Sequence, residues 1–324
     1  NGDPSGVSLE ARKQLALDAF QTTAAYDSAV SNELDDRFNS PDVPSRIHVA
    51  SEIGTSLRYG ENPHQPAAFY PAANATGPKG LAAAVQHGGK ELSFNNYLDL
   101  DGALRIARGF LIDIDEKRPH GCVVIKHTNP CGAAIDATQV GAWENALASD
   151  PESAFGCVIA FTHTVEKATA EAIGGHFLEC IIAPGYDDDA LEILSEKQNR
   201  RMLTLDDFTP RKDEVRIRQL DGGWVAQVQG PPSVDWSAVK CVTKAPADDD
   251  LVALARFGST VLSEVKSNSI VLVAQTETGF ATVGVGPGQT SRVEAVRIAA
   301  RRAGERAKGS MMVSDAFFPF RDGI

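Results

Sequence analysis

The sequence predicts an α/β fold, in which strands and helices alternate along the chain. Three runs rich in β-forming residues, Gly121–Ile125, Cys157–Phe161 and Cys180–Ala183, are bounded by turn-forming residues and read as strands. Helices are expected between and after them, at Lys167–Phe177 and Ala190–Met202. With 324 residues, 43% of them hydrophobic and 23% charged, the chain is long enough for two domains with real cores.

The beginning of the chain and the section after the middle are predicted from periodicity and turn residues. Ser8 to about Asp35 has apolar residues at helical spacing and predicts one helix or two joined helices. Residues 39–46 contain Pro and Ser and predict a linker. Residues 206–249 are interrupted by paired glycines and prolines, so we expect a connection between two subdomains there.

The last third of the chain predicts a second α/β unit. Ser269–Ala274 and Phe280–Val285 are expected to form a hairpin. Ser291 and Glu294 have the spacing of a capping box, which predicts a helix that runs to about Lys308. A further strand is expected at Gly309–Val313.

Composition excludes several classes of protein. The formal net charge of −12 argues against a protein that binds nucleic acid duplexes, and no apolar run is long enough to span a membrane. The N-terminus has no secretory signal, and it lacks a starting methionine, which indicates a chain that was cut or begins within a longer protein. The five cysteines are odd in number and lie in apolar sequence surroundings, which predicts reduced thiols and a cytoplasmic location.

Lys126 and His127 follow the strand at Gly121–Ile125 and are the strongest candidates for chemistry. Neighbours in a strand point to opposite faces, so the backbone must leave strand geometry if both are to serve one pocket. We expect residues 129–132, Asn-Pro-Cys-Gly, to supply that break. A neutral imidazole is a good base near neutral pH, and an adjacent ammonium can stabilise developing negative charge. A buried structural histidine beside a lysine explains the same dipeptide, and spacing alone does not separate the two.

Three other segments are candidate ligand-binding sites. Residues 57–65 could present a cation and an aromatic ring to an anionic ligand, or could be a plain surface loop. Gly284–Gly288 is a glycine-rich turn before a helix, but its spacing is not that of a dinucleotide fingerprint. Arg292 in the first turn of that helix opposes the helix dipole, so either an anionic ligand or solvent exposure must explain it. Residues 315–322 place phenylalanines between acids, as in a pocket floor where a planar heterocycle could stack.

A catalytic zinc site is not expected. Zinc deaminases carry H-x-E and P-C-x-x-C sequences. The corresponding residues here are His127-Thr128-Asn129, which lacks the glutamate, and residues 130–134, which lack the second cysteine.

Several motifs together resemble one family. They occur in order at 57–65, 90–96, 126–132, 153–156, 181–186, 266–269, 286–292 and 314–322. Their order and spacing are similar to the transformylase part of the bifunctional AICAR transformylase/IMP cyclohydrolase family, and the resemblance runs from about Ser8 to Ile324. Any single motif is weak evidence, but eight in order are highly specific.

The resemblance implies a fold of two cytidine-deaminase-like α/β/α subdomains without zinc. Residues 1–46 would be the last helix of an absent cyclohydrolase domain and a linker, 47–205 the first transformylase subdomain, 206–249 a connection and 250–324 the second subdomain. The family has a cyclohydrolase domain before this region and continues past residue 324, and Cys157 stands where Gly or Asp is expected.

The resemblance also implies an activity, which is formyl transfer from 10-formyltetrahydrofolate to the 5-amino group of AICAR in purine biosynthesis. The family acts as a cytoplasmic homodimer with sites across the interface. His127 would be the general base, and Lys126 would stabilise the oxyanion and help the folate nitrogen to leave. The implied ribotide-binding residues are Arg58, Tyr59, Asn96, Gly156, Glu179, Asn268, Arg292 and Phe317. Val293 and Asp322 would contact the folate, and the family allows a structural potassium ion near Ser267, Ser269 and Asp315.

Two alternatives stay open at this point. The first is a non-catalytic module of the same fold that binds nucleotides or mediates dimerisation. The second is a nicotinamide-dependent oxidoreductase built on the turn at Gly284–Gly288. Titration with AICAR, folate and NADH would separate the three interpretations.

Overall fold

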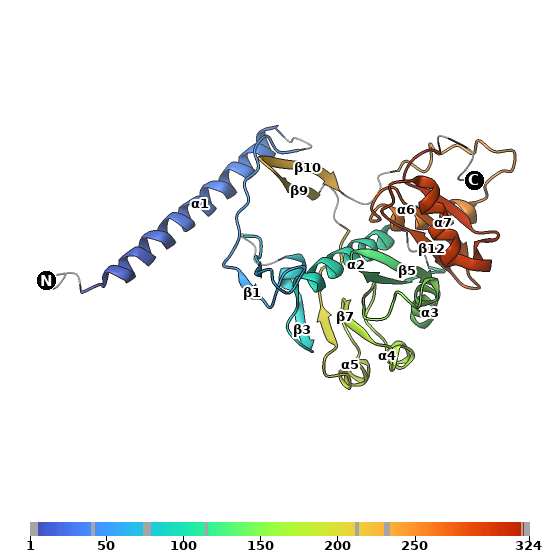
Figure 1. The fold of residues 1–324 in the computed structure, drawn as a ribbon, viewed down its shortest axis with the longest axis horizontal. Helices are drawn as coiled ribbons and strands as arrows, with labels where there is room; N and C mark the ends of the chain where they lie inside the picture. Colours follow the sequence, from blue (N-terminus) through green and yellow to red (C-terminus); the bar gives the residue numbers. More distant parts are fainter. Residues whose placement is uncertain are drawn as a thin grey trace. The chain divides into compact units, whose positions relative to one another are not determined.

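The computed structural model describes residues 6–39, 43–73, 79–113, 116–210, 214–229, 234–318 and 320. Their contacts divide them into two compact units (Figure 1). The first unit contains the described residues within 1–56, 68–82 and 213–229, and the second contains those within 57–67, 83–212 and 230–324. Helices and strands alternate along the chain, which confirms the predicted α/β class.

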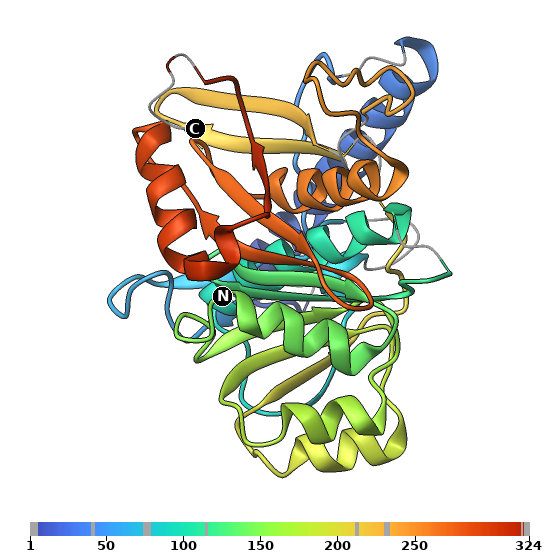
Figure 2. The same ribbon diagram turned by 90° about the vertical axis from the view of Figure 1, so that its right-hand side faces the viewer.

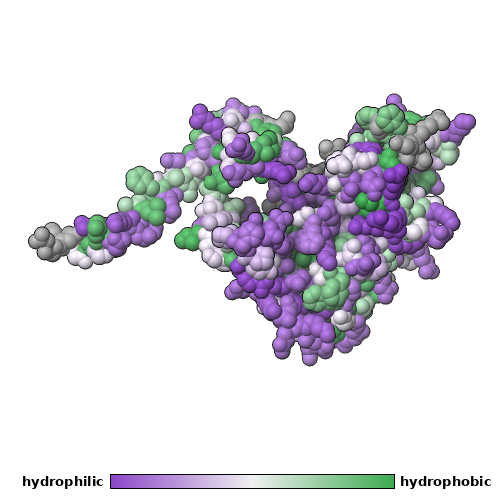
Figure 3. Space-filling view, in the orientation of Figure 1, coloured by the Kyte–Doolittle hydropathy of each residue, from purple (hydrophilic) through white to green (hydrophobic). Residues whose placement is uncertain are grey.

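The first unit is dominated by one long helix. Helix α1 (Leu9–Asn39) has no buried residue, and its exposed side chains include Phe20, Tyr26 and Phe38. Figure 3 shows apolar patches on the surface of this helix. The unit also contains the antiparallel hairpin of β9 (Glu214–Leu220) and β10 (Gly223–Gln229). Strands β1 (Thr55–Leu57) and β2 (Ala67–Phe69) form a separate two-stranded sheet.

The second unit is built on a mixed sheet of nine strands. Their order across the sheet is β13-β11-β12-β5-β4-β6-β7-β8-β3. The neighbours β6, β7 and β8 are parallel, and the other neighbouring pairs are antiparallel. The strands are β3 (Val85–Gly88), β4 (His120–Lys126), β5 (Asn129–Asp136), β6 (Cys157–Phe161), β7 (Leu178–Ala183), β8 (Arg201–Thr204), β11 (Ile270–Gln275), β12 (Phe280–Gly286) and β13 (Met311–Ser314).

Helices cover both faces of this sheet. The helical elements of this unit are α2 (Phe94–Asp113), α3 (Gln139–Ser149), α4 (Lys167–Ile173), α5 (Asp188–Ser195), α6 (Asp249–Leu262), α7 (Arg292–Ala303) and the 3-10 turn η2 (Gly304–Ala307). A further 3-10 turn, η1 (Gly80–Ala83), precedes β3 in the chain. On one face α2 and α6 pack together, with the rings of Phe110 and Phe257 stacked 5.3 Å apart. Figure 2 shows α3 (green) and α7 (red) in front of the sheet, on the opposite face. Glycines allow these two helices to approach closely, because a Cβ at Gly132 or Gly286 would collide with a carbonyl oxygen of α3 or α7.

The element order repeats within the second unit. The series α2-β4-β5-α3-β6 is followed later by α6-β11-β12-α7-β13. In each series the sheet order is the same, β5-β4-β6 and β12-β11-β13. The two series meet where β5 pairs antiparallel with β12, so a single sheet runs through both. The repetition is visible in the arrangement of the elements.

Several expected elements are confirmed and others need correction. The strand expected at 157–161 is β6, and the expected hairpin is β11 and β12. The helix expected at 167–177 ends at Ile173, because Gly174 takes a positive φ of 44°. The helix expected at 190–202 is wrong in its second half: α5 ends at Ser195, and 201–204 form the buried strand β8. Ser291 is the N-cap of α7, but its side chain makes no capping hydrogen bond.

The cysteines agree with the prediction except at one position. All five are free, and Cys122, Cys131, Cys157 and Cys180 are buried, whereas Cys241 is exposed rather than in apolar surroundings. Burial raises the pKa of the Cys131 and Cys157 thiols to about 12, so both are protonated and unreactive at neutral pH. Within the described residues, no helix is both long and apolar enough to cross a bilayer.

Candidate active site

Lys126 and His127 lie at a tight turn between β4 and β5. Strand β4 ends at Lys126 and β5 begins at Asn129, so the turn consists of His127 and Thr128. Both have positive φ, 52° and 63°. Positive φ at both central residues defines a type I′ hairpin turn, in which a β-branched threonine is unusual. The break in strand geometry therefore occurs, but it precedes the Asn-Pro-Cys-Gly segment that was expected to supply it.

A carboxylate from α2 contacts this turn. Asp99 accepts hydrogen bonds from the backbone N–H of His127 at 3.3 Å and of Thr128 at 2.6 Å. Burial raises the pKa of Asp99, and these two hydrogen bonds oppose that rise. The carboxyl is nearly inaccessible, with 9% of the residue exposed. Sequence reasoning missed Asp99, since an acidic residue inside a helix gives no local signal of such a contact.

The two candidate catalytic side chains differ in their surroundings. His127 is exposed, and none of the interactions recorded for the described residues is a hydrogen bond to its ring. This exposure excludes the alternative of a buried structural histidine. Lys126 is half-buried, and its Nζ donates a hydrogen bond to the carbonyl oxygen of Phe155 at 2.7 Å. The ammonium thus points toward the residue before Gly156.

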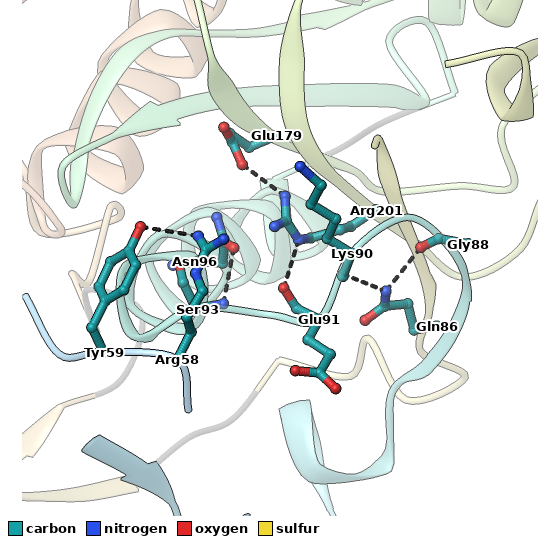
Figure 4. A network of polar contacts seen from close by, with 10 residues as sticks. All are labelled: Arg58, Tyr59, Gln86, Gly88, Lys90, Glu91, Ser93, Asn96, Glu179 and Arg201. Atoms are coloured by element: carbon teal, nitrogen blue, oxygen red, sulfur yellow. Dashed lines mark hydrogen bonds and ion pairs between the residues drawn. The ribbon is translucent and has the colours of Figure 1, made fainter. Parts of the chain in front are cut away.

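Two of the predicted ribotide-binding residues, Arg58 and Glu179, line a cavity of about 570 Å³. Cationic side chains predominate among its charged residues. The other charged residues that line it are Lys90, Glu196, Lys197, Arg200 and Arg201. Figure 4 shows Lys90, Glu179 and Arg201 gathered from three separate segments. Arg201 donates to Glu179 at 2.7 Å and to the Glu91 carbonyl at 3.1 Å, so Glu179 is neutralised.

Three cations that line this cavity, Arg58, Lys90 and Lys197, form no ion pair within the described residues. Arg58 stacks over the ring of its neighbour Tyr59, 4.7 Å from the centroid, and donates to the Tyr59 hydroxyl. Within the described part of the chain, no recorded interaction pairs the Lys90 ammonium with a carboxylate. The buried guanidinium of Arg200 is engaged with three backbone carbonyls and supports the wall. The cavity therefore retains positive charge for an anionic group.

Gly156 lies between the Lys126–His127 turn and this cavity. It takes a positive φ of 74°, and its N–H donates to the Phe177 carbonyl at 2.9 Å. The rings of Phe155 and Phe177 are 4.9 Å apart, and Phe177 lines the cavity. Lys126 contacts Phe155, so a continuous set of contacts joins the Lys126 side chain to the cavity wall.

Asn96 is occupied in part by a structural contact. Its Oδ1 accepts from the Ser93 N–H at 3.0 Å, and its own N–H donates to the Ser93 hydroxyl at 3.2 Å. These reciprocal bonds cap the N-terminus of α2. Of the Asn96 side chain, these two hydrogen bonds use the oxygen and not the amide nitrogen.

A second group of predicted residues forms a separate cluster at the start of α7. Arg292 donates to Asn268 Oδ1 at 2.7 Å and to Ser314 at 2.8 Å, and it pairs with Asp315. Asn268 also donates to the Gln289 carbonyl at 2.9 Å. The cation of Arg292 therefore forms an ion pair within the protein, and its guanidinium also contacts Asn268.

Phe317, Val293 and Asp322 are the remaining predicted site residues. Phe317 is 81% exposed, and Val293 is half-buried in the first turn of α7. Asp322 lies outside the described residues. Because β12 runs antiparallel to β5, its end at Gly286 lies toward the end of the sheet that carries the Lys126–His127 turn. Among the described residues, no hydrogen bond joins the Arg292 cluster to the Lys126–His127 turn.

The geometry can also be compared with the metal-site and dinucleotide-binding interpretations. In the described part of the chain, no three His, Cys, Asp or Glu side chains are grouped so as to hold a metal ion. Gly284 and Gly286 lie inside β12, where a Cβ would meet carbonyl oxygens of α7, so their absence of side chains serves packing. The dinucleotide interpretation loses its basis, since β12 belongs to an antiparallel hairpin rather than a β-α-β unit.

Comparison with known proteins identifies the family. The family described as AICARFT/IMPCHase bienzyme matches residues 2–302. The chain is 42% identical to the bifunctional purine biosynthesis protein PurH of Dinoroseobacter shibae, over 97% of this chain and 59% of the relative. The proteins of the same name from Desulfitobacterium hafniense and Persephonella marina are 40% and 41% identical, each over 98% of this chain and 60% of the relative. The chain thus spans less than two thirds of these relatives, and it belongs to the AICARFT/IMPCHase bienzyme family.

Proposed function

We propose that this chain carries the AICAR transformylase activity of a purine-biosynthesis enzyme, which moves the formyl group of 10-formyltetrahydrofolate to the 5-amino group of AICAR. The observation that carries this proposal is the exposed His127 beside Lys126 on a left-handed turn, in a chain of this family. Such a transfer requires proton removal, oxyanion stabilisation and orientation of two large ligands, which these residues can supply.

In this proposal His127 is the general base. The AICAR amine attacks the formyl carbon, and the His127 imidazole accepts the proton that the amine loses. Lys126 stabilises the tetrahedral oxyanion and assists departure of the folate nitrogen as the bond between that nitrogen and the formyl carbon breaks. The departing nitrogen takes up a proton to give tetrahydrofolate, which balances the proton that the amine loses. The exposed imidazole and the half-buried ammonium support these assignments.

The cationic cavity is proposed to hold the ribotide. Arg58 and Tyr59 present a charge and a ring, and Gly156 leaves room beside Phe177, where a Cβ would be 3.2 Å from the Phe177 ring. Because Arg201 neutralises Glu179, the cavity cations that form no ion pair within the described residues, Arg58, Lys90 and Lys197, are best suited to the phosphate. Asn96, Asn268, Arg292 and Phe317 complete the proposed ribotide contacts, and Val293 and Asp322 the folate contacts.

Arg58→Ala should raise the ribotide KM by about ten- to a hundredfold, the size of one charge-assisted hydrogen bond of about 1.5–3 kcal/mol. The KM of the dephosphorylated riboside should change much less. Arg218→Ala, which removes an exposed arginine from β9, is the matched control. Equal effects on ribotide and riboside would show that Arg58 does not contact the phosphate.

A structural potassium ion is proposed beside Asp315. The Ser269 hydroxyl is fully buried, and within the described residues it has no hydrogen-bond partner. The Ser269 N–H donates to Asp315 Oδ1 at 3.3 Å, and the Ser267 side chain also hydrogen-bonds to Asp315 and helps to lower its pKa against the effect of burial. An orphaned oxygen beside an ionised carboxylate fits a weakly bound monovalent cation.

Replacing potassium chloride with choline chloride at equal ionic strength should lower the thermal unfolding midpoint of the protein. Ser269→Ala should abolish that difference, because the variant lacks the orphaned oxygen. Ser263→Ala, at the C-terminus of α6, is the control and should retain the potassium effect. Identical unfolding midpoints in both salts for the unmodified protein would contradict the proposed potassium site.

Architecture and assembly complete the proposal. The repeated order α-β-β-α-β supports two cytidine-deaminase-like subdomains at 47–205 and 250–324, with 206–249 as a connection and 1–46 as the helix and linker before them. We propose a cytoplasmic homodimer whose sites are completed across the interface. The exposed rings of Phe155 and Phe317 support this, since aromatic residues beside a site favour burial against a partner or ligand.

The deciding experiment is an assay of the full-length protein with AICAR and 10-formyltetrahydrofolate, followed by the appearance of tetrahydrofolate. Turnover supports the transformylase. Binding of AICAR without turnover would favour the alternative, a non-catalytic nucleotide-binding or dimerisation module of the same fold.

A further inference from the structure

The conformation of the catalytic turn is not explained by its own sequence. Type I′ turns favour Asn, Asp and Gly at the two central positions. Histidine tolerates positive φ moderately, whereas a β-branched threonine does so rarely. His127 and Thr128 nevertheless have φ of 52° and 63°. A contact from elsewhere in the fold must stabilise this conformation.

Asp99 makes that contact, and it does so from a rigid element. It lies in the second turn of α2 and accepts from both N–H groups of the turn. Gly102, one helical turn later, also faces the turn: a Cβ there would be in ordinary contact with the Thr128 carbonyl oxygen, at 3.8 Å. The helix therefore holds the carboxylate in a fixed place beneath the turn.

The other side of the turn is also fixed by hydrogen bonds. The His127 carbonyl oxygen accepts from the Thr128 hydroxyl at 2.7 Å and from the Asn129 amide at 3.0 Å. The peptide between His127 and Thr128 is thus held at its oxygen by local side chains and at its N–H by Asp99. Loss of Asp99 would free the turn to relax toward negative φ, which would redirect the His127 side chain.

We propose that Asp99 is a positioning residue for the proposed transformylase. By accepting hydrogen bonds from both backbone N–H groups of the turn, Asp99 keeps His127 and Thr128 in the left-handed conformation. That conformation aims the imidazole at the substrate amine. This rests on the proposed function, although the effect on the turn does not. A carboxylate accepts two N–H bonds at once, whereas a carboxamide presents one acceptor and a donor that would face the second N–H.

Asp99→Asn in the full-length protein should therefore lower kcat by about ten- to a hundredfold, the cost of a misplaced catalytic group. The KM for AICAR should change by less than about threefold, since the cationic cavity is untouched. Asp101→Asn, two residues along the same helix and with its carboxylate paired to Arg105, is the matched control and should leave kcat unchanged. Adding Thr128→Gly to Asp99→Asn should restore part of kcat, because glycine adopts positive φ without help.

Amide hydrogen exchange tests the role of Asp99 independently of the proposed transformylase activity. Amide exchange in a peptide containing residues 127 and 128 should be slow in the unmodified protein and in Asp101→Asn, and fast in Asp99→Asn. If the unmodified protein shows no formyl transfer, the proposed function fails while the exchange result still tests Asp99.

The proposal is overturned if Asp99→Asn retains kcat, if its exchange at 127–128 is unchanged, or if kcat and KM worsen together without rescue by Thr128→Gly. Should Asp99→Asn fail to fold, Asp99→Glu replaces it, since this variant keeps the charge and shifts the carboxylate by one methylene. A lower kcat at unchanged KM in Asp99→Glu supports the positioning role, and an unchanged kcat overturns it.

Discussion

Replacing His127 with glycine is expected to lower kcat for formyl transfer by about two to four orders of magnitude, the usual contribution of a general base. Glycine suits this test because the position has φ of 52°, which glycine adopts without strain. The histidine ring is exposed, so its removal leaves no cavity in the core. Folding stability and AICAR affinity should therefore change little.

Chemical rescue makes this test specific. Added imidazole should restore part of the turnover of His127→Gly in proportion to its neutral form, because the space left by the ring is open to solvent. His48→Gly, which removes a histidine from the first unit, is the control and should show neither the loss nor the rescue. Near-normal turnover of His127→Gly would end the assignment of His127 as the base.

Much of the second unit was predictable because its strands are local, strongly apolar runs. Strand β6 matches the expected range, and all its residues are buried. Strand β8 was missed because Met202 and Leu203 continue the apolar spacing of the preceding helix. Its strand state depends on parallel pairing with β7, a long-range contact that local periodicity does not report.

The hairpin β9–β10 was missed for a different reason. Its two-residue turn is Asp221-Gly222, with Gly222 at a φ of 76°. Asp-Gly between alternating apolar residues is the strongest short-range hairpin signal, so the sequence contained the information. The glycines and prolines of segment 206–249 favour a connection, whereas the alternation in 214–220 favours a strand.

In the candidate site, too, residues marked by local sequence were predicted, and contacts between residues distant in sequence were not. Lys126 and His127 were found because they follow a clear strand. The support of their turn by Asp99 depends on contacts across 28 and 29 positions of sequence, and the pairing of Arg201 with Glu179 spans 22. Arg292 shows the same limit, because its position in the sequence left an anionic ligand and solvent exposure as explanations and did not indicate its ion pair with Asp315. Charges that act through the fold were not assignable from spacing.

Lys126 provides the second large effect. Lys126→Met keeps the length of the side chain and removes its charge, and kcat should fall by about a hundred- to a thousandfold, as for loss of an oxyanion-stabilising donor. The AICAR KM should change much less, because the interaction is strongest in the transition state. Lys167→Met, which removes an exposed lysine paired with Asp189, is the control for loss of one surface charge.

A structural role for Lys126 must be separated from this electrostatic one, since its Nζ donates to the Phe155 carbonyl next to Gly156. Lys126→Gln distinguishes the two roles, because its neutral amide can still donate to that carbonyl but supplies no positive charge to an oxyanion. If Lys126 acts through charge, Gln and Met should lose kcat equally, and Arg should retain part of it. If Lys126 acts by tethering Phe155, Gln should behave like the unmodified protein, and the KM of Met should rise as the Gly156 segment loosens. Nearly native turnover in Gln together with a raised KM in Met would therefore reject Lys126 as the oxyanion-stabilising group.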